Sequence, residues 1–294
     1  MNCEKYVKNH FSSLAGKSIV LFGATGGIGK HLARYILMLC GSLITVDRNP
    51  QKAAALKAEL QLEFANSSII NLYADLSDFK SVVSVCEQLK KLKPYAIIHN
   101  AGAYSIPRKM CDTGFLNVFQ INFLSPYYIT RELLPIISSQ GGRIVGVGSI
   151  AHNYSKTSKT DIDFSARKAS SLVYGNAKRY LMFSLFSLIK AYPNTHFAIT
   201  HPGITFTNIT AHYPKLIFAI IKHPMKILFM SAKKAAISIL AGLFCETKEF
   251  EWIGPKFFNI WGLPTKKLLK TCQKSEYAYI CETAEKVYKK IKNV

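Results

Sequence analysis

Short apolar runs alternate with segments of helical length along most of this chain. Six runs rich in β-branched residues have the length of strands, and their continuous apolar character is typical of strands buried on both faces of a parallel sheet. These runs lie at 18–22, 43–46, 69–73, 96–98, 143–147 and 196–200. Because strands alternate with helices, we predict an α/β fold with a doubly wound parallel sheet and helices on both of its faces.

The segments between the runs predict helices and a single domain. The predicted helices lie at 28–40, 49–62, 79–92, 113–138 and 172–191. No repeat or low-complexity linker interrupts the alternation, so we predict one domain over residues 1–294. Its parts are a core at 16–210, a substrate lid at 211–231 and a C-terminal part at 232–294, with helices at 232–245 and 276–292 and a last strand at 252–258.

The charge of the chain is strongly positive, with 38 Lys and Arg against 17 Asp and Glu, a net charge of +21. Such a surplus can attract nucleic acid, anionic lipid or an anionic substrate. Lysine dominates, and no five basic residues are consecutive, which favours a solvated surface over a surface that reads bases with arginine. We therefore predict no nucleic-acid partner. Lysines are dense at 215–234 and 266–292, which leaves a peripheral contact with a membrane surface as an alternative.

The cellular location is predicted from the N-terminal residues, the lengths of the apolar stretches and the cysteines. Residues 1–17 are polar and mixed in charge, and no stretch reaches 18 uninterrupted apolar residues. The seven cysteines are an odd number and include no C-x-x-C pair, so we predict reduced thiols and no metal site. We expect a cytoplasmic protein, either free or peripheral at a membrane surface.

A glycine cluster follows the first predicted strand and opens the first predicted helix. Glycine allows the unusual backbone angles of such a turn and lets the backbone approach a pyrophosphate, which the free N–H groups of the helix then bind. Two spacings are present, Gly23-x-x-x-Gly27-x-Gly29 and Gly23-x-x-Gly26-x-x-Gly29. The position of the cluster predicts a dinucleotide-binding turn, in which Thr25 and Ile28 would also contact the cofactor.

The end of the second predicted strand carries the two residue types that distinguish NAD from NADP. An acidic side chain there binds a ribose 2′-hydroxyl, whereas an arginine accommodates a 2′-phosphate. Asp47 occupies the acidic position, and Arg48 follows it. Because the carboxylate would repel a phosphate, the pair favours NAD over NADP without excluding NADP.

A tyrosine, a lysine and a serine form the candidate catalytic group. Tyr174 and Lys178 are four residues apart in the predicted helix at 172–191, so they lie on one helix face. A nearby ammonium stabilises a phenolate, which suits Tyr174 to general acid/base chemistry. Ser149 ends the fifth predicted strand, at the sheet edge where open α/β proteins bind their ligands.

Further motifs complete a known pattern. Asn122 lies in the predicted helix at 113–138, the fourth strand is followed by Asn100-Ala101-Gly102, and the sixth strand by Pro202-Gly203. In this order the motifs resemble the short-chain dehydrogenase/reductase family, whose fold is the Rossmann fold, over nearly the whole chain. Ser-Ile-Ala-His at 149–152 and Asp-Ile-Asp-Phe at 161–164 look like its retinol-dehydrogenase-like members. Phe22 and His99 depart from the family pattern, which more often has Thr and Asn at these positions.

The resemblance implies the roles of individual residues. The catalytic tetrad would be Asn122, Ser149, Tyr174 and Lys178. Gly23, Gly27 and Gly29 would cradle the pyrophosphate, Asp75 and Leu76 would meet the adenine, Asn100, Ala101 and Gly102 would line the ribose, and Pro202, Gly203 and Thr207 would hold the nicotinamide carboxamide. Tyr174 and Lys178 would also contact the cofactor, and Lys178 would lower the pKa of Tyr174.

The resulting hypothesis is an NAD(P)-dependent oxidoreductase that transfers a hydride between the nicotinamide and an apolar alcohol, aldehyde or ketone. Tyr174 would exchange the proton, Ser149 would bind the substrate oxygen, and Asn122 would anchor a water beside Lys178. The alternative is a non-catalytic dinucleotide-sensing or membrane-surface protein with the same fold. The resemblance also suggests a homo-oligomer, and the stripe Tyr180, Phe183 and Phe186 is interpreted as either core or a dimer face.

Overall fold

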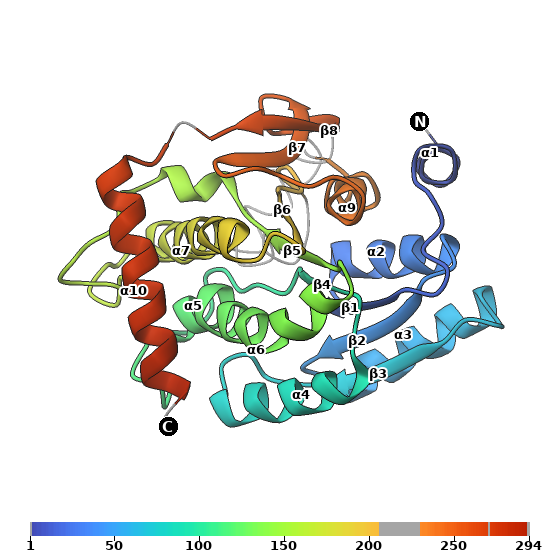
Figure 1. Ribbon diagram of the computed structural model, residues 1–294, viewed down its shortest axis with the longest axis horizontal. Coiled ribbons are helices and arrows are strands. Elements are labelled where there is room, and N and C mark those ends of the chain that lie inside the picture. Colours follow the sequence, from blue (N-terminus) through green and yellow to red (C-terminus); the bar gives the residue numbers. More distant parts are fainter. Residues whose placement is uncertain (1, 206–229, 270, 293–294) are drawn as a thin grey trace, which may run out of the picture.

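An eight-stranded sheet with helices on both faces organises the protein (Figure 1). The computed structural model describes residues 2–205, 230–269 and 271–292. The strand order is β3-β2-β1-β4-β5-β6-β7-β8, with parallel pairing up to β7 and antiparallel pairing of β7 with β8. The strands are β1 (Ser18–Phe22), β2 (Ser42–Asp47), β3 (Ile69–Tyr73), β4 (Ala96–His99), β5 (Arg143–Val147), β6 (His196–Thr200), β7 (Glu251–Phe257) and β8 (Trp261–Leu268). The prediction of a doubly wound α/β fold is confirmed.

Helices cover the two faces of this sheet. They are α1 (Cys3–His10), α2 (Gly27–Met38), α3 (Pro50–Glu63), α4 (Phe79–Leu92), α5 (Asn117–Phe119), α6 (Ser125–Ser139), α7 (Ser170–Ala191), α9 (Ala232–Leu240) and α10 (Lys274–Lys292). Among the described residues, none of these helices combines the length and the apolar character needed to cross a membrane.

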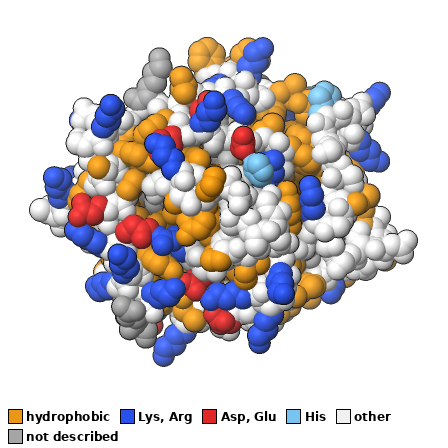
Figure 2. Space-filling view, in the orientation of Figure 1, with side chains coloured by type: hydrophobic (Ala, Val, Ile, Leu, Met, Phe, Trp, Pro, Cys, Tyr) orange, Lys and Arg blue, Asp and Glu red, His pale blue; other side chains and the backbone are white. Residues whose placement is uncertain are grey.

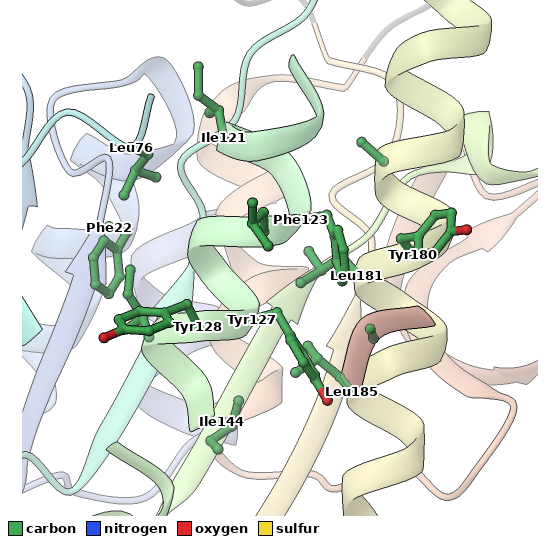
Figure 3. Packing of buried hydrophobic residues seen from close by; sticks show 14 of the residues in the cluster. Phe22, Leu76, Ile121, Phe123, Tyr127, Tyr128, Ile144, Tyr180, Leu181 and Leu185 are labelled. Carbon is green, nitrogen blue, oxygen red and sulfur yellow. The ribbon is translucent and has the colours of Figure 1, made fainter. Parts of the chain in front are cut away.

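The central strands are apolar throughout because both of their faces are buried. Val20 and Phe22 belong to one core cluster, whereas Ile19 and Leu21 belong to the cluster on the other face. The first cluster continues through α6 and α7, as Figure 3 shows for Phe22 and the aromatic and aliphatic side chains of these helices. Alternate side chains that enter two cores account for the uninterrupted apolar runs in the sequence.

Several predicted element boundaries were wrong. The helix expected at 113–138 starts at Asn117 and contains a π-helical turn at Gln120–Leu124 before α6 begins. The helix expected at 232–245 ends at Leu240 and continues as a single 3₁₀ turn. The strand expected at 252–258 is not the last one, because β8 turns back along it as an antiparallel edge strand, and α1 was not expected at all.

The C-terminal part packs directly on the core, and α10 lies across α6 and α7 (Figure 1). The Tyr180, Phe183 and Phe186 side chains of α7 are fully buried within the chain, so this stripe belongs to the core and not to a dimer face. Of the predicted lid at 211–231, all but the last two residues lie outside the described residues. The division into a core, a lid and a C-terminal part therefore stays a prediction.

Parallel register gathers the candidate functional segments at one edge of the sheet. Phe22 pairs with His99, His99 with Gly146, and Val147 with Thr200. The chain segments that follow β1, β4, β5 and β6 consequently leave the sheet side by side. These four segments carry the glycine turn, the Asn-Ala-Gly motif, the candidate serine and the Pro-Gly motif.

Candidate active site

The glycine turn packs too closely for side chains at two of its positions. Gly23 has φ +78°, and a Cβ there would lie 2.9 Å from the Cα of Ala101. A Cβ on Gly29 would lie 2.1 Å from the carbonyl oxygen of Gly23. Helix α2 begins at Gly27, and its N-cap residue Gly26 offers no side-chain hydrogen bond to the first turn. The N–H groups of that turn are therefore suited to bind an anion.

A cavity of about 430 Å³ opens in front of this turn. Its lining includes most of the predicted cofactor residues: Gly23, Thr25, Gly27, Ile28, Gly29, Asp47, Arg48, Asp75, Leu76, Asn100, Ala101 and Gly102. It also includes Lys52 and Tyr104, which the sequence reasoning missed, although Lys52 is on the first turn of α3 and Tyr104 closely follows the Asn-Ala-Gly motif. The cavity is therefore built by four strand-to-helix connections of the same sheet edge.

Asp47 and Asn100 hold the glycine turn in place. Asp47 is buried, and its Oδ1 accepts hydrogen bonds from the backbone N–H of Thr25 at 2.9 Å and from its hydroxyl at 2.7 Å. Its Oδ2 is buried without a protein partner. Burial raises the pKa of Asp47, although Thr25 and Thr45 oppose the rise. From the other side, the amide of Asn100 donates to the carbonyl oxygens of Phe22 at 3.2 Å and Gly23 at 3.0 Å.

Asp75 at the cavity wall is held by a turn of its own, whereas Pro202 and Gly203 do not line the cavity. Asp75 accepts hydrogen bonds from the N–H and the hydroxyl of Ser77 in the turn before α4. Gly203 has φ +84° and lies against the β7–β8 turn, where its Cβ would be 2.6 Å from the carbonyl oxygen of Ile260. Pro202 precedes it in the same segment after β6, and Thr207 lies outside the described residues.

The two departures from the family pattern pack against each other. Phe22 and His99 are register partners on β1 and β4, and their rings stack with centroids 5.3 Å apart. His99 is buried and its Nε2 pairs with the hydroxyl of Thr130 at 2.8 Å. Burial lowers the pKa of His99 to about 3. The two residues therefore form a neutral stacked pair beneath the glycine turn.

Asn122 lies in the π-helical turn between α5 and α6. Its Nδ2 donates to the carbonyl oxygens of Ala103 at 2.7 Å and Val118 at 2.8 Å, and its Oδ1 accepts from the N–H of Ala103 at 3.3 Å. A π-turn displaces the backbone from the regular helical hydrogen bonds and is frequent at functional sites. Here the turn lets Asn122 attach the helix to the cavity wall at 100–104.

Ser149 and Tyr174 meet because a glycine lets their elements approach. Ser149 caps a short 3₁₀ turn, Ile150–Asn153, and a Cβ on Gly175 would lie 2.2 Å from the carbonyl oxygen of Ala151 in that turn. The Ser149 side chain thereby comes close enough to the Tyr174 phenol to lower its pKa. Because Gly175 has no side chain, the turn that carries Ser149 can pack against α7 between Tyr174 and Lys178.

Lys178 lies one helical turn from Tyr174 and is almost completely buried. Its Nζ donates to the carbonyl oxygen of Val147 at 2.9 Å and lies 5.7 Å from the centre of the Tyr174 ring. A Cβ on Gly102 would be 2.8 Å from the Oδ1 of Asn122 and 3.5 Å from this Nζ. The cavity wall at Gly102 therefore adjoins Asn122 and Lys178, and all four predicted tetrad residues lie in one region.

The proton affinities in this group are dominated by burial. Burial lowers the pKa of Lys178 to about 8, and burial raises the pKa of Tyr174 to about 12, although Ser149 opposes the rise. Removal of the phenol from water is the largest of the effects on Tyr174. That Lys178 lowers the pKa of Tyr174 stays a prediction.

An ion pair that the sequence reasoning missed supports this region. Arg179 follows Lys178, is 2% exposed, and binds Glu276 on α10 with two hydrogen bonds of 2.8 and 2.7 Å. Arg179 also donates to the carbonyl oxygens of His152 and Thr271. The only sequence signal was that Arg179 directly precedes an apolar stretch of the helix. The pair joins α7 to the turn behind Ser149 and to α10.

Comparison with known proteins agrees with this geometry. A family model described as short chain dehydrogenase matches residues 17–170. Retinol dehydrogenase 12 of Mus musculus is 30% identical over 203 residues, which are 67% of this chain and 64% of that protein. Polyprenol dehydrogenase of Homo sapiens is 26% identical over 204 residues, 66% of this chain and 62% of that protein. The chain spans less than two thirds of the length of these relatives.

Solved structures show the same fold. A putative uncharacterized protein from Mycobacterium paratuberculosis has a TM-score of 0.74 at 20% identity and covers 96% of both chains. A short-chain dehydrogenase from Sphingobium yanoikuyae, solved with NADPH, has a TM-score of 0.61 at 18% identity over 92% of this chain and 94% of that chain. The family model spans the glycine turn, Asn122 and Ser149, and the structure adds Tyr174 and Lys178 beside them, so this chain belongs to the short-chain dehydrogenase family.

Proposed function

We propose that this protein is an NAD(P)-dependent oxidoreductase that interconverts an apolar alcohol with its aldehyde or ketone, with Tyr174 as general acid/base. One observation carries the proposal. The Ser149 side chain is close enough to the Tyr174 phenol to lower its pKa, and Tyr174 lies one helical turn from a buried lysine, beside a cavity that a glycine turn rims. A phenol, a second hydroxyl and an ammonium in this order are suited to move a proton to or from a carbonyl oxygen.

The residues around the cavity fit a dinucleotide. Gly23 and Gly29 let the turn fold tightly against neighbouring backbone, and the start of α2, which lines the cavity, presents its N–H groups to a pyrophosphate there. The Oδ2 of Asp47 is a buried acceptor without a protein partner, which a ribose hydroxyl could satisfy. Arg48 and Lys52 add positive charge at the same end of the cavity.

Each tetrad residue then has a role that its surroundings support. A bound nicotinamide dinucleotide would supply or accept the hydride. Tyr174, as a phenol with its pKa raised by burial to about 12, holds at neutral pH the proton that a reduced carbonyl oxygen needs. Ser149 would hold that oxygen by a hydrogen bond. Lys178 would bind the ribose, and Asn122 keeps the wall beside Lys178 in position.

An apolar substrate is supported by the names of relatives and by the aromatic surroundings of Tyr174. The relatives include proteins named retinol dehydrogenase and polyprenol dehydrogenase, both for apolar alcohols. In this chain the Tyr104 ring packs edge-on against Tyr174 with centroids 5.3 Å apart. This contact places an aromatic surface next to the proposed proton donor.

The proposal is tested by incubating the protein with each reduced and oxidised nicotinamide dinucleotide and a panel of long-chain and cyclic alcohols, aldehydes and ketones. We expect a change in the nicotinamide absorbance with at least one apolar pair. Cofactor binding, detected by fluorescence titration, without turnover on any compound of the panel would instead favour a dinucleotide-sensing protein.

For the cofactor itself, we propose a preference for NAD that resides in Asp47. Asp47→Asn keeps an acceptor for the Thr25 N–H but removes the negative charge from the buried oxygen. A hydrogen bond to a charged group contributes about 1.5–3 kcal/mol, so we expect the dissociation constant for NAD to rise about 10- to 100-fold. NADP should bind Asp47→Asn more tightly than it binds the wild type, because the repulsion of the 2′-phosphate is gone.

The matched variant for this measurement is Arg48→Ala. If Arg48 only covers the adenine, this variant weakens NAD and NADP to the same extent. Tighter binding of NADP than of NAD by the wild-type protein, with that preference lost in Arg48→Ala, would assign the selectivity to the arginine and contradict the proposal.

A further inference from the structure

The hairpin formed by β7 and β8 exposes a group of large apolar side chains. Phe258 at its tip is 81% exposed, and three apolar residues near the tip are at least one third exposed. We call the four residues the hairpin patch: Phe257, Phe258, Trp261 and Leu263. In Figure 2, hydrophobic and basic side chains lie together along the top of the view, above the sheet edge that β7 and β8 form in Figure 1. Large apolar residues grouped on a surface mark an interaction site more often than chance exposure does.

The tip residue is unfavourable for folding in two ways. Phe258 has φ +50° and Asn259 has φ +58°, the left-handed region in which a bulky side chain costs about 1 kcal/mol or more. Asparagine and glycine are the residues that tolerate this turn conformation. A phenylalanine that is both strained and in water contributes little to stability, so its presence at this position points to a function outside the fold.

The charge near the tip of the hairpin is positive, and the one acidic residue of the hairpin, Glu251, lies at the opposite end of β7. No Asp or Glu occurs between Trp252 and Ser275, whereas that stretch has five lysines. Lys256 and Lys266 are exposed beside the patch. The ammonium of Lys267 instead donates to the carbonyl oxygen of Pro255 at 2.7 Å and to the Oδ1 of Asn259 at 2.8 Å. Lys267 therefore holds the tip, and Lys256 and Lys266 provide a positive rim.

A second copy of this chain is a poorer occupant than a lipid surface. Edge strands that avoid pairing with another strand commonly carry lysine and proline, and the edge strand β8 has Pro264, Lys266 and Lys267. A second copy would also bring the same lysines against these, and the one acidic residue of the hairpin, Glu251, lies at the end of β7 away from the tip. Aromatic side chains among lysines suit the boundary between lipid headgroups and acyl chains of an anionic membrane.

We propose that the hairpin patch inserts into the surface of an anionic lipid membrane while the lysines around it bind the headgroups. The hairpin contacts the segment after β6, which carries the predicted nicotinamide residues. The Nε2 of His201 donates to the carbonyl oxygen of Asn259 at 3.0 Å, and Gly203 packs against Ile260. Docking would thus hold the segment after β6 next to the lipid, which would supply an apolar substrate. Only this last step rests on the proposed function.

The test is co-sedimentation of the full chain with vesicles of phosphatidylcholine with or without phosphatidylserine. We expect binding to the vesicles with phosphatidylserine that weakens as salt is added. Phe258→Asn and Trp261→Ser should each weaken binding about tenfold or more, because each removes the burial of one aromatic side chain. Trp261 fluorescence should shift to shorter wavelength on binding, and Trp261→Ser should lose that shift.

Two controls show whether weaker vesicle binding comes from the lost aromatic side chain or from unfolding of the variant. Phe258→Asn relieves the turn, so its thermal stability should equal or exceed that of the wild type. Leu62→Ser changes an equally prominent apolar residue, 90% exposed on α3, and should leave vesicle binding unchanged. The binding assay needs no turnover, so it holds even if no substrate is found.

Equal vesicle binding by the wild type and by Phe258→Asn would overturn the proposal. A concentration-dependent dimer that Phe258→Asn abolishes, together with no vesicle binding, would overturn it in favour of an interface between copies of this chain.

Discussion

Tyr174→Phe is expected to lower the turnover number by about 10²- to 10⁴-fold, the range that a positioned general acid/base contributes. The variant loses one hydroxyl and keeps the ring, so the edge-on contact with Tyr104 remains. The lost hydroxyl is the one whose pKa responds to Ser149, and that pKa, raised by burial to about 12, makes it a proton donor at neutral pH. Turnover is measured in the carbonyl-reducing direction at saturating cofactor.

The matched control is Tyr104→Phe, which removes a hydroxyl from the neighbouring ring. Its turnover should fall far less than that of Tyr174→Phe, and both variants should bind the dinucleotide with nearly the affinity of the wild type. A Tyr174→Phe protein that keeps more than about a tenth of the wild-type turnover would contradict the assigned role, since acid/base catalysis contributes at least 10²-fold.

The central sheet could be predicted because its signal is local. A strand buried on both faces needs a continuous apolar run, and the runs at β1, β5 and β6 are found where they were expected. The edge strand β8 lacks this signal because only part of it is buried, and it carries Pro264 and two lysines. The turn before it is formed by Phe258 and Asn259 with positive φ and not by a glycine pair, so no turn motif marks it.

The sequence was enough to predict which residues form the candidate site, but not which contacts they make. The resemblance and the motif spacing located Asn122, Ser149, Tyr174 and Lys178, which the structure brings into one region. It was the structure that showed Asp47 bound to Thr25, because that contact depends on how the glycine turn folds back. Burial of the phenol likewise depends on packing from several elements and decides the pKa of Tyr174.

The ion pair between Arg179 and Glu276 was invisible in the sequence because its partners are 97 residues apart. The Glu276 carboxylate accepts two hydrogen bonds from Arg179 and two from Thr157, so it joins α7, the loop after the Ser149 turn and the start of α10. Burial alone would raise the pKa of Glu276, but the hydrogen bonds from Arg179 and Thr157 outweigh it and hold the pKa below 4.5. This contribution to stability is therefore present above pH 4.5 and is lost as the pH falls through the lowered pKa.

Glu276→Gln is expected to lower the free energy of unfolding by about 3–5 kcal/mol, because it leaves the buried Arg179 guanidinium without a counter-charge. The free energy is measured by urea unfolding. In thermal unfolding, the melting temperature should fall by roughly 5–15 °C. Glu285→Gln on the same helix breaks the more exposed pair with Arg131 and should cost less than about 1 kcal/mol.

The double variant Arg179→Met with Glu276→Met distinguishes loss of the ion pair from burial of an unpaired Arg179 charge. Replacing both partners with apolar side chains removes the desolvation cost along with the attraction, so the double variant should be more stable than Glu276→Gln alone. Because Arg179 also holds the carbonyl oxygen of His152, three residues beyond Ser149, the double variant should fold yet lose part of its turnover. A free energy of unfolding for Glu276→Gln within about 1 kcal/mol of the wild-type value would contradict this prediction. The pair would then contribute no more than a surface ion pair, and another contact would have to hold the turn that carries Ser149.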